Sequence, residues 1–442
     1  MKMITQHAIV IGASMGGLLA ARALTDYYQQ VTVLERDVFP VPGENRKGVP
    51  QGRHAHGLLA RGREVLEQLF PGFTQELEAQ GALATDILQQ LHWFANGGYL
   101  SKTKSELNGL FVSRPLLEAW IRQRLLLLPN VQALENCDVL GLVTTADPVQ
   151  VTGVRFIQRN EGNTEEILKA DLVVDTTGRN SRTPMWLEAL GYEKPLEEKV
   201  KVNVCYTTRM YRRQPEHLQG DLGAVIEPSQ PNWRGGVILA QENSHWIVSI
   251  AGYMGDHTPM DEQGFLEFAK SISAQDIYEV IKNAEPLSEL LNYQFSSSQR
   301  RHYEQLKRFP EGYLVFGDAI SSFNPIYGQG MTVAAVEALA LQDCLGQGVD
   351  HLAPRFFKAA SKIVDIPWSI AVGGDFRIPQ VEGKPTPMVR FLNWYRCKLQ
   401  IAARRDPVLA IAFLKVVNLM AAPSSLIQPQ IALRVLLGNI FT

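Results

Sequence analysis

The N-terminal stretch HAIVIGASMGGLLAARAL, residues 7–24, constrains the fold more than any other part of this sequence. It predicts a short apolar strand over residues 7–11, a glycine turn over 12–17 and a helix from Leu18 to about Tyr28. A second apolar strand, Val31–Glu35, follows directly. Because two parallel strands need a crossover connection, usually a helix, the pattern predicts a βαβ unit and a parallel sheet.

The turn in this unit has the spacing G-x-S-x-x-G, with Gly12, Ser14 and Gly17. The dinucleotide fingerprint requires small residues here, because the turn is tight and the backbone must approach a pyrophosphate closely. Serine is small enough to replace the middle glycine, and the helix N-terminus still offers its amides to phosphate. Glu35, 23 positions after Gly12, suits ribose hydroxyls. The unit therefore predicts dinucleotide binding, with a merely tight turn as the alternative.

Composition excludes several other classes. The chain has 442 residues, 45% of them hydrophobic, and a net charge of -2, so it is globular and has no basic footprint for nucleic acid. Its four cysteines occur singly, which indicates free thiols rather than disulfides or a zinc site. We find no stretch of about 20 apolar residues that would predict a transmembrane helix. We expect a cytoplasmic protein without a metal.

The rest of the chain can be divided into predicted helices, strands and loops by its sequence pattern. Helical periodicity covers residues 58–69 and 114–128, and strands are predicted near 138–143, 150–158 and 170–175. A Gly-, Pro- and charge-rich loop occupies 40–57, a length that is usually functional. Alternating strands from 200 to 253 predict an antiparallel sheet, helices follow over 261–292, and 351–442 is mostly helical. We predict a discontinuous dinucleotide-binding domain in three pieces (1–75, 105–190 and 300–350), a substrate domain (76–104 and 191–299) and a C-terminal helical region (351–442).

Two further motifs carry polar residues beside glycines or helix starts. In LVFGDAISSFNPIYGQGM, Asp318 ends a buried strand, Pro325, Gly328 and Gly330 form a loop, and a helix follows from Met331. This arrangement suits a flavin, with the carboxylate on the ribitol and the helix N-terminus near the pyrimidine edge. An N-capping loop is the alternative.

Arg114 lies in the first turn of a predicted helix that Ser113 would cap. An arginine at this position opposes the helix dipole, so a nearby phosphate or ribose would explain it better than helix stability does. A surface arginine is the alternative.

With these motifs in this order, the chain resembles the FAD-dependent class A monooxygenases of the aromatic-hydroxylase fold over roughly residues 5–345. GVPQGRHAHGLL (48–59) and ADLVVDTTGRNSRTP (170–184) most resemble the epoxidases of polyene and polyether polyketides, and more distantly the squalene epoxidases. The resemblance implies an α/β fold: a discontinuous Rossmann-like FAD-binding domain of the p-hydroxybenzoate hydroxylase type, an antiparallel β-sheet substrate domain and a helical C-terminal region.

The resemblance also implies how FAD is bound. Gly12, Ser14 and Gly17 would meet the pyrophosphate, Glu35 the adenosine ribose, Arg114 and Asp318 the linker, and the amides of Gly330 and Met331 the flavin ring. The backbone near Val139 would touch adenine. The other implied cofactor-binding residues are Met15, Gly16, Arg36, Arg53, His54, His56, Pro325 and Gly328. Arg53 and His56, beside the ring or the nicotinamide entry, are weak catalytic candidates, and a structural loop histidine is the alternative. Two histidines without further ligands do not indicate a metal site.

One departure concerns the reductant. The family's second motif usually reads Asp-Gly after the apolar strand, whereas this chain has Thr177 and Gly178. Reduction by NAD(P)H is therefore expected either directly or through a partner flavin reductase, with Arg179 and Arg182 as nearby phosphate partners.

The chemistry implied by the resemblance needs no side-chain nucleophile. Reduced flavin and O2 give a C4a-hydroperoxide, which transfers one oxygen to an apolar polyketide- or terpenoid-like substrate by epoxidation or hydroxylation. One alternating face of the predicted sheet would line the pocket, drawn from Val202, Val204, Tyr206, Val237, Leu239, Trp246, Val248 and Ile250. The alternatives are a reductase or dehydrogenase of prenyl-type chains, a flavin-less binding module, and a halogenase, although the halogenase motif W-x-W-x-I-P is absent.

Overall fold

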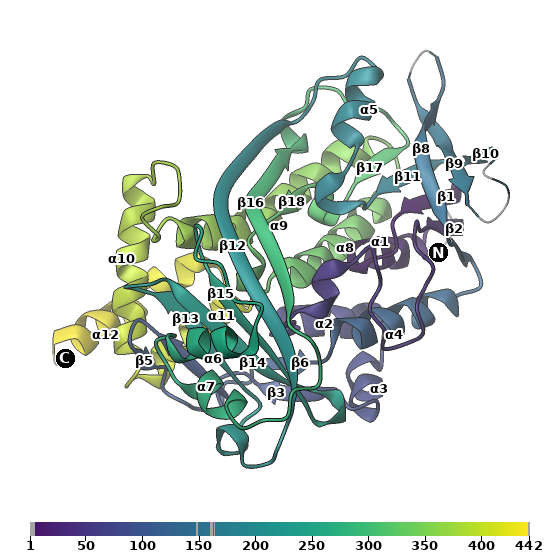
Figure 1. Ribbon diagram of the computed structural model, residues 1–442. Coiled ribbons are helices and arrows are strands. Elements are labelled where there is room, and N and C mark those ends of the chain that lie inside the picture. Colours follow the sequence, from purple (N-terminus) through teal and green to yellow (C-terminus); the bar gives the residue numbers. More distant parts are fainter. Residues whose placement is uncertain (1–4, 147–148, 160–161, 163, 441–442) are drawn as a thin grey trace.

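A computed structural model describes residues 5–146, 149–159, 162 and 164–440. Its first layer is a five-stranded sheet in the order β17-β11-β1-β2-β7, and every neighbouring pair is parallel. The strands are Thr5–Ile11 (β1), Tyr28–Leu34 (β2), Val131–Leu134 (β7), Leu172–Asp175 (β11) and Tyr313–Val315 (β17). The parallel sheet is therefore confirmed, and it is assembled from segments far apart in the sequence (Figure 1).

Helices cover this sheet. They are Met15–Leu24 (α1), Ala60–Leu69 (α2), Phe73–Ala79 (α3), Arg114–Leu126 (α4), Thr183–Ala189 (α5), Gly330–Gly346 (α8) and Leu352–Asp375 (α9). The predicted span of the first helix was wrong at both ends, since it begins at Met15 and ends at Leu24. It starts earlier because the turn needs only Gly12 to Ser14. It ends earlier because Tyr28 already pairs with Thr5 as part of β2.

Three antiparallel strands extend from the edge of the first layer: Cys137–Thr144 (β8), Val151–Gln158 (β9) and Glu165–Lys169 (β10). The first two match the predicted strands. The third was missed, because EEILK is almost entirely exposed and polar and shows no apolar alternation. A short pair, Leu83–Asp86 (β3) and Asn108–Phe111 (β6), completes the smaller sheets.

The second layer is an eight-stranded sheet in the order β18-β16-β12-β15-β14-β13-β4-β5. Its strands are Leu91–Ala95 (β4), Gly98–Tyr99 (β5), Leu196–Arg212 (β12), Gly223–Ser229 (β13), Arg234–Gln241 (β14), His245–Gly252 (β15), Leu291–His302 (β16) and Ser321–Ser322 (β18). The antiparallel prediction for 200–253 is confirmed, although β13 also pairs in parallel with β4.

The helical prediction for 261–292 was only partly right. Helices Glu262–Lys270 (α6) and Asp276–Ile281 (α7) are followed by β16, which begins at Leu291 and pairs with β12 along its length. The polar sequence NYQFSSSQRRH gives a weak local signal, and it becomes a strand through this long-range pairing.

The register of this sheet separates its two faces. Tyr206 lies opposite Ala251 and Tyr293, and Thr208 opposite Ser249, so these side chains share one face. Trp246, Val248 and Ile250 lie on the other face, which α6 and α7 cover. Those three predicted pocket residues are therefore core, as expected for one of the two faces.

The C-terminal region is helical, as predicted, with Pro387–Ala402 (α10), Pro407–Val417 (α11) and Pro429–Ile440 (α12) after α9. Within the described part of the chain, no helix is both long enough and apolar enough to cross a membrane. The boundaries of the three sequence-based domains stay a prediction.

Candidate functional site

Three turns meet at the carboxyl ends of β1, β11 and β17, where ligands bind to parallel sheets. The hydroxyl of Thr176 donates to the carbonyl oxygens of Ile11 (2.7 Å) and Gly12 (3.1 Å). A Cβ placed at Gly178 would lie 3.8 Å from the Cβ of Asp318. The fingerprint turn, the Thr177–Gly178 turn and the Asp318 turn thus form one site, although more than 300 residues separate the first from the last.

The fingerprint turn accepts only glycine at its two ends. Gly12 has a φ of 103°, a conformation that side chains disfavour. A Cβ at residue 17 would lie 1.8 Å from the carbonyl oxygen of Gly12. The two glycines therefore bring the start of α1 directly against the end of β1. Met15, buried, is the first residue of the helix, and Gly16 packs near Phe316.

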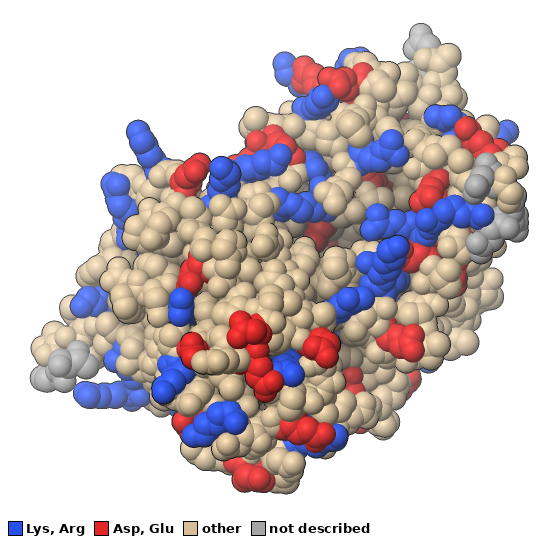
Figure 2. All heavy atoms as spheres, in the orientation of Figure 1, with Lys and Arg blue, Asp and Glu red and all other residues tan. Residues whose placement is uncertain are grey.

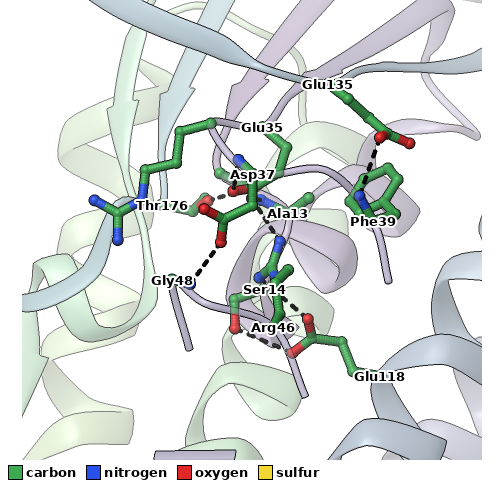
Figure 3. Close-up of polar contacts among 12 residues, drawn as sticks. Ala13, Ser14, Glu35, Asp37, Phe39, Arg46, Gly48, Glu118, Glu135 and Thr176 are labelled. Carbon is green, nitrogen blue, oxygen red and sulfur yellow. Dashed lines mark hydrogen bonds and ion pairs between the residues drawn. The ribbon is translucent and has the colours of Figure 1, made fainter. Parts of the chain in front are cut away.

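Glu35 is held at this turn by three groups (Figure 3). One carboxylate oxygen accepts from the amide of Ala13 at 2.7 Å and lies 2.8 Å from the Arg46 guanidinium, and the other accepts from the amide of Asp37 at 3.0 Å. Arg46 also lies 3.1 Å from a carboxylate oxygen of Glu118. Sequence reasoning missed Arg46, and its only signal was a position in the predicted functional loop.

Arg114 reaches the same turn from α4. Its guanidinium donates to the hydroxyl of Ser14 at 2.9 Å and to Glu118 at 3.1 Å, and Ser113 caps the helix by accepting from the amide of Leu116. Arg114 is thus neither exposed nor isolated. Glu118, one helical turn further on, compensates the unfavourable position of Arg114 in the helix dipole.

The donor set at this turn fits a diphosphate. Two buried guanidinium groups, those of Arg46 and Arg114, converge on the N-terminus of α1, which itself favours an anion. The Nε of Arg46 is buried and has no hydrogen-bond partner within the described residues. An unsatisfied buried donor costs free energy, so a phosphate oxygen here would stabilise the site.

Asp318 differs from these acids because its side chain is exposed. Within the described ranges, no hydrogen bond or ion pair joins its carboxylate to another residue. Loss of hydration among the surrounding protein atoms raises its pKa, and the charges of Arg114 and Arg179 act in the opposite direction. A carboxylate with free acceptor oxygens, within the electrostatic influence of two arginines, fits the hydroxyls of a ribitol chain.

The loop before α8 leaves space beside its glycines. Gly328 has a φ of 67°, and a Cβ at Gly328 or Gly330 would meet nothing within 4 Å. Pro325, on the same loop, is exposed. The bare backbone and the helix N-terminus at Gly330 therefore face open space, which fits a flat ring.

This loop is fixed from behind by α9. The side-chain amide of Asn324 donates to Asp375 at 2.9 Å, and the hydroxyl of Tyr327 donates to the same carboxyl oxygen at 3.1 Å. Burial raises the pKa of Asp375 to about 7. Sequence reasoning missed Asp375, because helix α9 was assigned no contact with the site.

The two predicted histidines lie in the segment that contacts strand β12 of the eight-stranded sheet. His54 is buried; its Nδ1 is 2.8 Å from the hydroxyl of Thr208, and its ring packs against Tyr206 and Tyr293. The Nδ1 of His56 is 2.9 Å from the carbonyl oxygen of His54. Burial lowers the pKa of both rings to about 4, helped by Arg53 for His54 and by Arg114 for His56, so both are neutral at pH 7.

The other predicted site residues are less closely engaged. Arg53 and Arg36 are exposed, and Arg36 lies near Gly48. Val139 is half-buried in β8, two residues after Cys137, whose amide donates to the carbonyl of Glu35. Of the described side chains, no three His, Cys, Asp or Glu residues are grouped to hold a metal ion.

Glu337 supports the Asp318 turn from α8. It is fully buried, and one oxygen accepts from the amide of Gly317 at 2.9 Å. Burial raises the pKa of Glu337 to about 8, and the nearby charge of Asp318 acts in the same direction. The folded protein therefore keeps this proton between about pH 4.5, the ordinary value, and pH 8, where the unfolded chain loses it.

This difference predicts a pH-dependent effect of Glu337→Gln, which keeps the acceptor oxygen and cannot ionise. The free energy of unfolding of the native protein should fall as pH rises from 5 to 8, relative to the variant. At pH 8 the free energy of unfolding of the variant should exceed that of the native protein by about 2–4 kcal/mol, and at pH 5 the two values should be nearly equal. Denaturant melts at both pH values test this, with the exposed Glu193→Gln as the control. An equal difference at both pH values would contradict the assignment.

Comparisons with known proteins agree with this geometry. The family described as FAD binding domain matches residues 5–352. Protein Rv3254 of Mycobacterium tuberculosis is 33% identical over 435 residues, covering 94% of this chain and 90% of that protein.

Among solved structures, a flavoprotein/dehydrogenase from Cytophaga hutchinsonii has a TM-score of 0.69 at 15% identity, covering 98% of both chains. The flavin-dependent brominase Bmp2 has a TM-score of 0.66 at 14% identity, covering 93% of both. The p-nitrophenol 4-monooxygenase of Pseudomonas putida DLL-E4 has 0.64 at 15% identity, covering 95% of this chain and 99% of that one. At such identities these likenesses show the fold. Together with the family match, they establish that the chain belongs to the FAD binding domain family and is an FAD-dependent oxidoreductase.

Proposed function

We propose that this protein is an FAD-dependent monooxygenase that inserts one oxygen atom of O2 into an apolar, polyketide- or terpenoid-like substrate, by epoxidation or hydroxylation. The observation that carries the proposal is the wall opposite the Asn324–Gly330 loop. There the eight-stranded sheet presents Tyr206, Phe295 and Val204 toward Phe323 and Val333, in one continuous apolar cluster. An apolar, aromatic sheet face beside a flavin site would suit a substrate with little polarity.

In this proposal, each group of site residues would hold a different part of FAD. The turn from Gly12 to Gly17 receives the pyrophosphate, together with Arg46 and Arg114, and Glu35 receives the adenosine ribose. The Asp318 carboxylate receives the ribitol hydroxyls. Gly330 and Met331 present amides to the ring, and the backbone near Val139 receives adenine. Arg36 stays a proposed adenosine contact, at the exposed edge of the site.

Bound FAD would supply the electrons that activate O2. The protein's own residues would orient the substrate, exclude water and stabilise negative charge. The N-terminus of α8 provides the last of these, because unpaired amides there carry positive potential. Arg53, adjacent to His54 in the sequence, is exposed. His54 and His56 would contribute without carrying charge. The two histidines are neutral, so they position neighbours such as Thr208 and do not protonate the substrate at neutral pH.

The stoichiometry requires a two-electron donor, since the second oxygen atom leaves as water. NAD(P)H is the proposed source, acting directly or through a partner flavin reductase. Thr177, where the related enzymes carry an aspartate, donates from both its amide (2.9 Å) and its hydroxyl (2.6 Å) to Asp175. Its side chain therefore stabilises its own turn and provides no carboxylate at this position.

Two other functions are compatible with the fold. A reductase or dehydrogenase of prenyl-type chains would use the same FAD site and pocket without needing O2. The fold is also shared with the brominase Bmp2. A halogenase would need bromide or chloride for product formation, which separates it from oxygen insertion.

Gly330 allows the ring position to be tested without disturbing the fold. A Cβ there meets no protein atom within 4 Å, so Gly330→Ala should fold normally. If the flavin ring lies against this backbone, FAD should bind at least about tenfold more weakly, because the methyl group would occupy the ring's place. Fluorescence titration of the flavin-free variant with FAD measures this. Gly373→Ala is the control, because a Cβ at Gly373 also meets no atom within 4 Å. Gly348 would not serve, since its φ of 105° is strained for alanine. Unchanged affinity of Gly330→Ala would contradict the assigned ring position.

The oxygen chemistry itself is tested by stopped-flow absorbance. The chemically reduced protein is mixed with oxygenated buffer, with and without candidate polyenes, terpenoids and aromatics. The proposal predicts a resolvable species between the reduced and oxidised spectra, whose decay a substrate accelerates, and a product 16 mass units heavier. Slow, single-step reoxidation with every candidate would contradict it and favour the reductase. Anaerobic mixing of the oxidised protein with NADPH then shows whether a partner reductase is needed.

A further inference from the structure

The last helix carries its apolar side chains on the outside. Leu433, Leu436, Leu437 and Ile440 of α12 are between 47% and 62% exposed. Their spacing of i, i+3, i+4 and i+7 places them on one stripe, opposite Val435, which is buried. A helix that packs against a protein body normally shows the reverse pattern, so the outer face of α12 is available for something else.

The neighbouring helix α10 also carries exposed apolar side chains. Met388, Phe391, Leu392 and Trp394 are between 43% and 63% exposed. The two helices are in contact, since the side-chain amide of Asn439 donates to the carbonyl oxygen of Lys398 at 2.9 Å. Both lie at one end of the molecule (Figure 1). We call these eight side chains, together with Ile427 in the turn before α12, the C-terminal apolar face.

The segment that bears this face is strongly cationic. Residues 384–442 contain eight Lys or Arg residues and a single acid, Asp406, although the whole chain carries a net charge of -2. Arg390 lies between Met388 and Phe391, is exposed and has no ion pair within the described residues. Arg434 flanks the leucine stripe and is paired with Asp406 at 2.8 Å. In Figure 2 blue side chains project along the same left-hand edge. The rest of the protein is correspondingly acidic.

From this combination we propose that the C-terminal apolar face docks onto the surface of an anionic lipid bilayer, with α10 and α12 lying in the interface. Apolar side chains would enter the acyl region, Trp394 would lie at the headgroup level, and the basic residues would contact anionic headgroups. Self-association through this face is disfavoured, because two copies would bring two cationic segments together.

This arrangement would give the enzyme access to a substrate dissolved in the membrane. The docking is independent of the reaction catalysed, so it stands even if the proposed oxygen insertion fails.

Flotation of the full-length holoprotein with vesicles tests the docking. The vesicles are phosphatidylcholine alone, or phosphatidylcholine with about one third phosphatidylglycerol, a content that gives a strong negative surface potential. The native protein should float with the anionic vesicles, and less so at high salt. Leu436→Glu/Leu437→Glu should partition at least about tenfold less, since each leucine loses its apolar transfer energy. Bound flavin and circular dichroism confirm that the variant is folded.

Ile167→Glu is the matched control, because Ile167 is 59% exposed on β10, away from this face. It should float like the native protein. Equal flotation of the native protein and the double variant, or no flotation of either, would overturn the proposal. So would a native dimer, seen by light scattering, that the double variant converts to a monomer without any vesicle binding. That result would assign the face to a second copy of the chain.

Discussion

The contact between Gly17 and the carbonyl of Gly12 is the constraint on which the site depends. No side chain fits at residue 17, and only glycine readily adopts the backbone of residue 12. This contact places the N-terminus of α1 at the carboxyl edge of the parallel sheet. Thr176 then bonds to the same turn, so the end of β11 is fixed in relation to β1. The position of the N-terminus of α1 thus follows from the absence of side chains at residues 12 and 17.

Around that turn, acids and arginines from distant segments alternate. Glu35 contacts Arg46, Arg46 contacts Glu118, and Glu118 contacts Arg114. All four are buried, and a buried charge without a partner would cost several kcal/mol. The network therefore holds loop 40–57 and helix α4 against the fingerprint turn. It also places the guanidinium groups of Arg46 and Arg114 beside the N-terminus of α1, an arrangement that would favour a diphosphate there.

The sequence predicted those parts of the site that have a local pattern. The fingerprint turn, Glu35, Arg114 and Asp318 all belong to motifs in which glycine or helix-start chemistry is visible along the chain. The fold class followed from the same βαβ pattern and from the alternation over 200–253. These features depend on residues close together in the sequence, so a single segment is enough to predict them.

What the sequence did not reveal depends on partners far away in the chain. Arg46 is one of several charges in a loop, and only its ion pairs with Glu35 and Glu118 distinguish it. Asp375 lies within the apolar pattern of α9 and gains its role from Asn324. Strand β16 was missed because its sequence is polar, and only its first two residues fell within the range predicted as helical; pairing with β12 imposes its conformation.

We infer that the three turns at Gly12–Gly17, Thr176–Gly178 and Phe316–Met331 together form one FAD site. Hydrogen–deuterium exchange of the flavin-free protein, with and without added FAD, tests it most directly. FAD should slow exchange in all three segments together, and in loop 40–57 as well. Protection of only one segment, or protection elsewhere with these three unchanged, would contradict it.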